Sequence, residues 1–232
     1  MIDNLSIIIS IVALGVSLLS NILMITRNIR DYKELKVSFN IIRKMELTLE
    51  PSEKIDFSRF NVEDYIKELL EKINRIYPKA IFNVSIKLIK SVDTEKPEES
   101  KLYTWFKFPQ QMQNEQNLYT IKNNTDYRSL IENNGKFFFV SDLKKYSAFT
   151  NYKNESKNYL QRYNTVIVFP IRKKGRDKKY DIIGFLCVDS PQRLNNVKKN
   201  EKVISLVEMA ASVIYDFLNQ NKDKQEIYSI KQ

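Results

Sequence analysis

The sequence predicts an α+β domain built on an antiparallel sheet, preceded by one N-terminal transmembrane helix. Three observations lead to this fold class. An apolar run without a single charge occupies residues 5–26. Behind it, segments with the two-residue period of a strand occur mainly in neighbouring pairs joined by short turns, as in hairpins. Helix-like segments lie before, between and after these pairs, so the order is not that of a βαβ array with a parallel sheet.

The apolar run of residues 5–26 is long enough to cross a bilayer as a helix, because 22 residues rise roughly 33 Å. Fourteen of these residues are Leu, Ile, Val or Met. A secretory signal would begin with Lys or Arg before the apolar run, and this sequence has neither there. Arg27, Arg30, Lys33 and Lys36 follow the run directly. We therefore expect a single-pass protein of the cell membrane, in contact with the lipid bilayer, with its N-terminus outside and its C-terminal domain cytoplasmic.

The chain is predicted to divide into four parts. Residues 1–26 form the anchor, and residues 27–54 form a juxtamembrane, coiled-coil-like helix with a linker. Residues 55–220 form the globular domain, and residues 221–232 form a polar tail. A chain of 232 residues has room for one domain of ordinary size beside the membrane segment. Its single cysteine, Cys187, cannot form an internal disulfide, which is typical of a reducing compartment.

Histidine is absent from the sequence, and this restricts the possible chemistry. A Ser-His-Asp triad and a histidine-ligated zinc or haem site are excluded. Nothing else in the sequence indicates catalysis, so we expect a protein that is not an enzyme and carries no metal or cofactor. The net charge of +10 is attributed to anionic lipid at the cytoplasmic face and to solubility, and no nucleic-acid partner is expected.

The juxtamembrane segment carries a narrow apolar stripe on an otherwise charged helix. The stripe consists of Tyr32, Leu35, Phe39 and Ile42, at steps of three and four residues. Such a stripe favours pairing with a second copy of the chain, and we expect a homo-oligomer with its contact at these residues. Packing of this helix on its own domain is the alternative.

The first elements of the domain are a helix and a hairpin. A wide apolar face predicts a helix over Val62–Tyr77, with Asn61 as its N-cap. Alternating residues within 79–91 predict a strand, which turns through 93–100 and returns as a strand over 102–108.

The second half of the domain repeats these signals. We expect a helix over Leu118–Glu132 that stops at Asn133-Asn134-Gly135, followed by a strand within 136–143. The polar, aromatic segment 144–164 is interpreted as a loop with a short helix or as the wall of a binding site. Two strong strands, 164–173 and 180–191, are joined by a basic hairpin loop, and a closing helix runs from Val203 through Phe217.

Several of these segments resemble the GAF-domain family. The stretch NTDYRSLIENNGKFFFVSD resembles the family's helix, turn and strand that closes on an Asp. The stretch VIVFPIRKKGRDKKYDIIGFLCVDSP is similar to its pair of strands ending "vPi" and "iGvL-vds", and the helix Val203 to Leu218 lies where the family has its last helix. The most specific combination is Phe169-Pro170-Ile171 with Ile183-Gly184-Phe185-Leu186 and Asp189-Ser190. The resemblance covers roughly residues 60–220.

This resemblance implies a sheet of about six antiparallel strands with helices on one face that often pair two subunits. It also implies a small-molecule pocket between the other face and irregular connecting segments. The NKFDE-type pattern of cyclic-nucleotide-binding members is absent. Bilin attachment and free-methionine-sulfoxide reduction need cysteines in other places or in greater number, and Cys187 is interpreted as a core residue.

The segments that the resemblance places over the pocket mix cationic donors with aromatic rings. This combination suits an anionic, stackable ligand such as a nucleotide. The predicted ligand-binding residues are Trp105, Tyr127, Arg128, Lys144, Tyr146, Arg162 and Tyr163. In the alternative interpretation the tyrosines cover the sheet edge, Lys and Arg are solvated, and Trp105 belongs to the core. Asp142 and Asp189 are interpreted as strand ends that bond nearby backbone amides, rather than as an acid–base pair.

The sequence thus predicts a membrane-anchored sensory module that binds a small molecule and signals through an oligomeric juxtamembrane helix. Two alternatives stay open. In one, ligand binding acts on the transmembrane helices themselves, which disrupt the membrane; in the other, the domain is a ligand-free adaptor for a partner protein.

Overall fold

The computed structural model describes residues 60–109, 118–156, 158–174, 180–221 and 230–231. The predicted transmembrane helix, the juxtamembrane stripe of Tyr32, Leu35, Phe39 and Ile42, and most of the predicted polar tail lie outside these residues. Within the described part of the chain, no helix combines the length and the apolar character that a membrane crossing needs.

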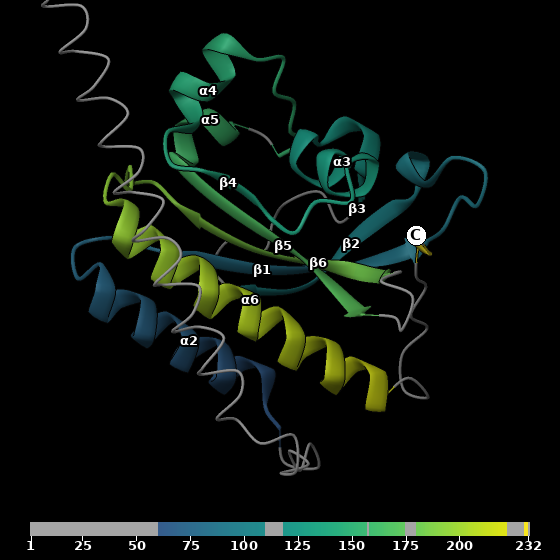
Figure 1. The fold of residues 1–232 in the computed structure, drawn as a ribbon, viewed down its shortest axis with the longest axis horizontal. Coiled ribbons are helices and arrows are strands. Elements are labelled where there is room, and N and C mark those ends of the chain that lie inside the picture. The colour runs from purple at the N-terminus through teal and green to yellow at the C-terminus, as the bar shows by residue number, and fades with distance from the viewer. Residues whose placement is uncertain (1–59, 110–117, 157, 175–179, 222–229, 232) are drawn as a thin grey trace, which may run out of the picture. The chain divides into compact units, whose positions relative to one another are not determined.

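A single antiparallel sheet forms the centre of the domain (Figure 1). Its spatial order is β3-β2-β1-β6-β5-β4, and the two-residue β7 lies beside β6. The strands are β1 (Asn83–Ser91), β2 (Lys101–Phe108), β3 (Leu118–Thr120), β4 (Phe138–Val140), β5 (Thr165–Lys174), β6 (Tyr180–Ser190) and β7 (Ile230–Lys231). Both predicted hairpins, β1–β2 and β5–β6, are present and antiparallel, which confirms the α+β class and the sheet of about six strands.

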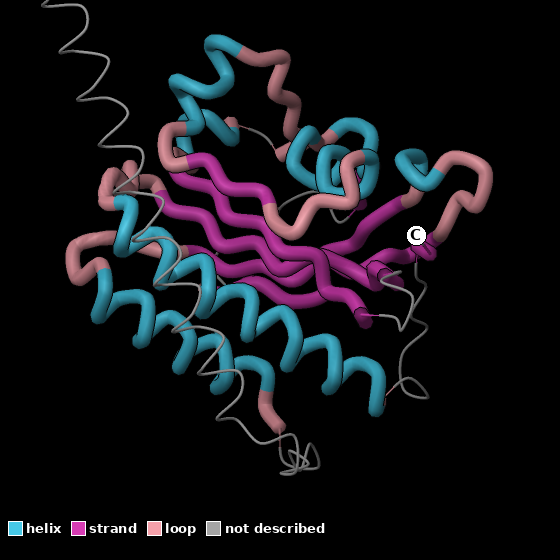
Figure 2. Tube along the Cα trace, viewed as in Figure 1, coloured by secondary structure: helices cyan, strands magenta, loops and turns pink. Residues whose placement is uncertain are grey.

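Helices cover the two faces of this sheet in different ways (Figure 2). Two long helices, α2 (Val62–Ile76) and α6 (Val197–Gln220), lie side by side across one face. The other face carries the short helices α3 (Thr125–Glu132), α4 (Leu143–Phe149) and α5 (Tyr159–Arg162) and the loops that connect them. Two 3₁₀ turns, η2 (Pro97–Glu99) and η4 (Ile121–Asn123), complete the described elements.

Asparagine side chains begin both long helices. Asn61 accepts a hydrogen bond of 2.9 Å from the backbone N–H of Glu63, as predicted for an N-cap. Asn196 caps α6 in the same way, through the N–H of Lys199 at 3.0 Å. Helix α6 therefore begins before Val203, where the apolar repeat starts. Its polar first turns are held by this cap and by the buried Asn200, which accepts a hydrogen bond from Tyr77 and donates one to Leu194.

The predicted helix over Leu118–Glu132 is wrong in its first half, residues 118–124. Residues 118–120 form β3, because Tyr119 pairs with Leu102 on the edge of β2 and buries its ring. A 3₁₀ turn follows, and the α-helix begins only at Thr125.

The predicted stop of this helix at Asn133-Asn134-Gly135 is confirmed. Asn134, at φ 46°, adopts the left-handed conformation. The N–H groups of Gly135 and Asn134 donate to the carbonyls of Leu130 and Ile131, the Schellman pattern that satisfies a helix end.

Alternation along the strands produces two separate cores. On β1, the side chains of Val84, Ile86 and Leu88 enter the apolar core under α2 and α6. Ile89 belongs to the second core, under α3 and α4, together with Phe185 of β6. Gly184 of β6 has no room for a side chain beside β1, since a Cβ there would collide with the carbonyl oxygen of Lys87.

Candidate ligand-binding site

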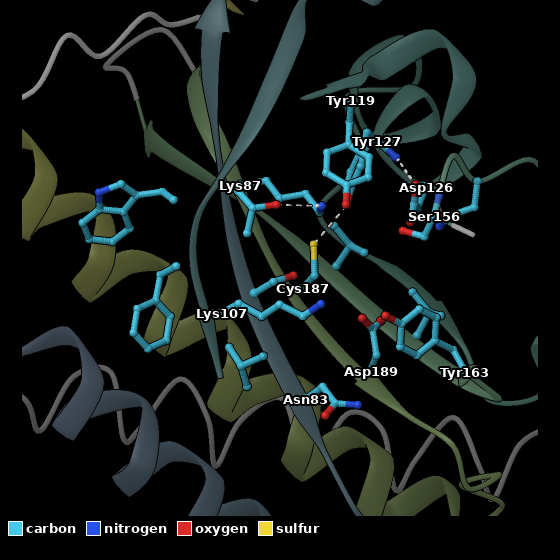
Figure 3. Close-up of a pocket in the computed structure, with 18 residues that line it drawn as sticks. Asn83, Lys87, Lys107, Tyr119, Asp126, Tyr127, Ser156, Tyr163, Cys187 and Asp189 are labelled. Atoms are coloured by element: carbon cyan, nitrogen blue, oxygen red, sulfur yellow. Dashed lines mark hydrogen bonds between the residues drawn. The ribbon is translucent and has the colours of Figure 1, made fainter. Parts of the chain in front are cut away.

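A cavity of about 320 Å³ lies on the sheet face opposite α2 and α6. Strands β1, β2, β5 and β6 provide its floor, and β3, α3 and the loop before residue 157 provide its walls and roof (Figure 3). Its volume is at the lower end of the range of about 300–1,000 Å³ that is usual for small-molecule sites.

Strand periodicity makes the floor of this cavity polar. Asn83, Ser85 and Lys87 alternate with the apolar residues that β1 directs toward the helices, so all three line the cavity. Cys187 and Asp189 do the same on the neighbouring β6. The cavity face of the sheet therefore carries charge at its centre.

Lys87 is the most enclosed cation of the cavity, with 7% of its surface exposed. Its Nζ lies 3.2 Å from the centroid of the Tyr119 ring and donates a hydrogen bond of 3.4 Å to Oγ1 of Thr104. Burial lowers the pKa of Lys87, and the carboxylates of Asp189 and Asp126 act in the opposite direction. Lys107 of β2 also lines the cavity, and burial lowers its pKa as well.

Two carboxyl groups face these lysines. Asp126 of α3 accepts hydrogen bonds from the N–H of Tyr127 at 2.9 Å and the hydroxyl of Tyr152 at 3.3 Å, and burial raises its pKa to about 6. Burial, with the charge of Asp126 as a second cause, raises the pKa of Asp189 to about 7. No described residue donates a hydrogen bond to the Asp189 carboxylate, contrary to the expectation that it bonds backbone amides. Asp142 does bond a backbone amide as expected, because its carboxylate caps α4 by accepting a hydrogen bond from the N–H of Lys145.

Cys187 lies in the floor beneath Tyr127. Its Sγ is 3.4 Å from the Tyr127 hydroxyl, and the Tyr127 ring packs on Phe185 with 4.8 Å between the ring centroids. Burial raises the pKa of Cys187 to about 12, so the sulfur stays a thiol near neutral pH and is a poor nucleophile. This environment confirms the interpretation of Cys187 as a core residue.

Glu155 fixes the roof of the cavity. Its carboxylate accepts hydrogen bonds from the N–H of Thr120 at 2.8 Å and from the side-chain amide of Asn123 at 2.7 Å. Its own N–H donates to the side-chain oxygen of Asn124 at 3.0 Å. The loop is thereby held against the segment between β3 and α3, and it brings Asn154 to the cavity wall.

Three of the seven predicted ligand-binding residues line the cavity: Trp105, Tyr127 and Tyr163. Trp105 also packs against the core under α2 and α6, so both interpretations of this residue apply in part. Tyr127 and Tyr163 are buried, which makes their rings part of the wall.

The other four predicted residues lie outside the cavity lining. Arg128 is on the outer side of α3, 3.8 Å from Glu132, because the helix turns Asp126 and Tyr127 inward. Lys144 is exposed on α4. Tyr146 packs its ring edge-on against two aromatic neighbours in the second core, and Arg162 ends α5 beside the lining residue Tyr163.

Sequence reasoning missed the four charged residues at the centre of the site: Lys87, Lys107, Asp126 and Asp189. The alternation along β1 did mark Lys87 as a member of the polar face. This face is covered by the second layer of the domain, so its polar residues line the cavity.

No family model and no curated protein matches the chain. Among solved structures, it is similar to type II free methionine-R-sulfoxide reductase from Thermoplasma acidophilum, with 14% identity and a TM-score of 0.44 over 68% of this chain and 92% of that chain. The GAF domain/HD domain protein from Geobacter sulfurreducens matches with 10% identity and a TM-score of 0.42 over 66% of this chain and 93% of that chain.

A GAF domain from an Acinetobacter phosphoenolpyruvate-protein phosphotransferase matches with 12% identity and a TM-score of 0.39 over 69% of this chain and 96% of that chain. Two of these three structures are GAF domains, the family that the sequence resembles. At such identities and TM-scores they carry no function over to this chain.

Proposed function

We propose that residues 60–220 form a sensory domain that binds a small polar ligand, whose anionic group is held by Lys87 and Lys107. The observation that carries this proposal is the Lys87 ammonium group, which is buried at the wall of a ligand-sized cavity. Among the described residues it forms no ion pair with a carboxylate; its neighbours are an aromatic ring and one hydroxyl.

A buried ammonium group in this state is unfavourable. Transfer of a charge from water into a protein is costly unless a counter-charge and hydrogen bonds replace the lost solvation. The Tyr119 ring offsets part of this cost, by roughly 2 kcal/mol or more for a desolvated cation–π contact. An anionic group in the cavity would supply the missing counter-charge, and Lys107 on the next strand would provide a second contact.

The size of the cavity limits the ligand. A volume of about 320 Å³ favours a metabolite or at most a mononucleotide over a dinucleotide. The Tyr119 ring carries the Lys87 ammonium on one face, so this face does not offer a stacking surface to a ligand. The anionic character predicted for the ligand is retained here, with Lys87 and Lys107 in the role first given to Arg128 and Arg162.

We propose a binding role without catalysis, and the state of Cys187 supports this part of the proposal. The Cys187 thiol is protonated near neutral pH and packed beneath Tyr127, and so it offers no activated nucleophile. In the full chain, we propose that ligand binding changes the packing of the juxtamembrane helices near Leu35 and Phe39, on the cytoplasmic side of a membrane anchor. Output through the membrane helices themselves, or through a partner protein, stays the alternative.

The test is calorimetry on the purified full-length chain with a panel of carboxylates, phosphates, amino acids and mononucleotides. Lys87→Met should weaken binding of the identified ligand about tenfold to a hundredfold, because a charge-assisted hydrogen bond contributes about 1.5–3 kcal/mol. Lys144→Met, which removes an exposed lysine outside the cavity, is the control and should leave the affinity unchanged. Circular dichroism of both variants checks that they fold. If no compound in the panel binds, or if Lys87→Met binds like the wild type, the proposal fails.

A further inference from the structure

We infer that the ligand is a zwitterion of about the size of an amino acid, whose ammonium group binds between Asp126 and Asp189 while its anionic group binds Lys87 and Lys107. This inference rests on the proposed function and specifies the second charge of the ligand.

Charges of both signs meet in the cavity from four different elements. Lys87 comes from β1, Lys107 from β2, Asp126 from α3 and Asp189 from β6, and all four line the same space. Figure 3 shows the two lysine side chains reaching toward the middle of the cavity from one side, and the two aspartates on the other side. The sequence separations are large, so only the packing of the sheet against its roof creates this arrangement.

Among the described residues, Lys87, Asp126 and Asp189 are not joined to one another by an ion pair. Asp189 accepts no hydrogen bond from a described residue, and Asp126 is oriented by two donors, Tyr127 and Tyr152, that carry no charge. Lys87 and Asp126 are buried and Asp189 is half-buried, and opposite charges in such a space that form no ion pair are unfavourable on both sides. A molecule that spans the gap with one group of each sign would compensate both.

Ligands of a single sign fit this cavity less well. A purely anionic ligand would satisfy the lysines but bring its negative charge toward two carboxylates. A purely cationic ligand would satisfy Asp126 and Asp189 and be repelled by Lys87 and Lys107. The polar groups of Asn83 and Ser85, on the floor, could bond either group and do not change this balance.

The pH dependence of binding separates a zwitterion from a simple anion. The titratable groups that interact with the charge of Asp189 are Asp126, Lys87, Lys107, Cys187 and the three tyrosines Tyr127, Tyr152 and Tyr163. Burial raises the pKa values of Tyr163 and Cys187 further above neutrality, whereas the pKa values of Asp126 and Asp189 reach about 6 and about 7. The two carboxyl groups therefore lose their charge as the pH falls from 8 to 5. Over that range a zwitterion should bind more weakly and a simple carboxylate more tightly.

The experiment uses the full-length chain with each of the common L-amino acids, its α-hydroxy acid and its amide. The hydroxy acid replaces the ammonium group with an uncharged group, and the amide removes the carboxylate. We expect a matching amino acid at 100 times its Kd to raise the Tm by about 5–10 °C. The hydroxy acid and the amide should each bind at least tenfold more weakly, and the affinity for the amino acid should fall as the pH decreases from 8 to 5.

Asp189→Asn is the test variant, because the amide keeps the shape of the side chain without its charge. It should weaken binding of the amino acid at least tenfold and tighten binding of the hydroxy acid, because the anion no longer faces the Asp189 charge. Asp64→Asn, at an exposed aspartate of α2, is the matched control and should change neither affinity.

Each remaining outcome decides the inference. If the hydroxy acids bind as tightly as the amino acids, or if Asp189→Asn binds both like the wild type, the zwitterion is wrong and the anionic ligand of the proposed function stands. If anions such as mononucleotides bind and no amino acid does, the result is the same. If no compound of either class raises the Tm, the zwitterion and the proposed function fail together.

Discussion

The two faces of the sheet are made by the same strands and have opposite character. Under α2 and α6, the core consists of aliphatic and aromatic side chains, among them the fully buried Val203, Val207 and Ile214. On the other face, the short helices and loops enclose a cavity with lysines and aspartates at its centre. Because the side-chain period of a strand is two, neighbouring residues such as Ile86 and Lys87 serve different faces.

We infer from this difference that the helix side of the sheet provides most of the folding stability and the cavity side provides ligand binding. The helix side removes apolar surface from water without buried charge, the arrangement that contributes most to folding. The cavity side keeps charged groups in a partly dry space, which is unfavourable without a ligand. Substitutions on the two faces should therefore have different consequences, and the following three predictions test this from the largest effect to the smallest.

Ile214→Ala on the helix side should have the largest effect on stability. Ile214 belongs to α6 and is completely buried in the apolar core on the helix side. Truncating such a residue lowers the free energy of unfolding by about 2–5 kcal/mol, because burial is lost and a cavity is left behind. Urea denaturation measures the change. Met209→Ala, at an exposed position of the same helix, should stay within about 0.5 kcal/mol of the wild type. A ligand affinity that falls in the folded Ile214→Ala protein would contradict the separation of the two faces.

The pH dependence of stability should reveal the charges on the cavity side. The folded-state pKa of Asp189, about 7, lies above the usual value near 4, so the ligand-free folded state binds a proton that the unfolded state releases. The ligand-free protein should therefore become more stable as the pH falls from 8 to 5, and Asp126 contributes in the same direction. Asp189→Asn should remove about 1–3 kcal/mol of this gain.

Urea denaturation of the ligand-free chain at pH 8, 6.5 and 5 measures this effect, with Asp64→Asn as the control for an exposed carboxylate. If Asp189→Asn and the wild type show the same slope with pH, Asp189 is not a buried charge of the cavity.

Tyr127→Phe should have the smallest effect. The substitution removes the contact between the hydroxyl and Cys187 but keeps the ring packed on Phe185. A hydrogen bond to sulfur is weak, so we expect a loss of at most about 1 kcal/mol in urea denaturation and a change in ligand affinity of less than tenfold. A loss above 2 kcal/mol would mean that the hydroxyl has another role in the wall.

Local patterns predicted the elements of the domain well where the elements are long. Helix α2 with its Asn61 cap, both hairpins and the stop after α3 follow from periodicity and from residues that favour caps and turns. The three-residue strand β3 was missed because its pairing with β2 is a long-range contact, and three residues show no period. The start of α6 was placed too late because its first turns carry no apolar repeat.

The sequence by itself determined the α+β class, the antiparallel pairing of neighbouring strands and the absence of histidine chemistry, because these depend on local order and composition. Only the tertiary structure decided which charged residues meet. Asp126 faces the cavity and Arg128 faces away because of the rotation of α3 under its contacts with the sheet. Lys87 and Asp189 share one space because register aligns β1 with β6 and a roof held by Glu155 closes over them. The meeting of these charged residues depends on contacts between segments that are distant in the sequence, and the periodicity of a single segment carries no information on such contacts.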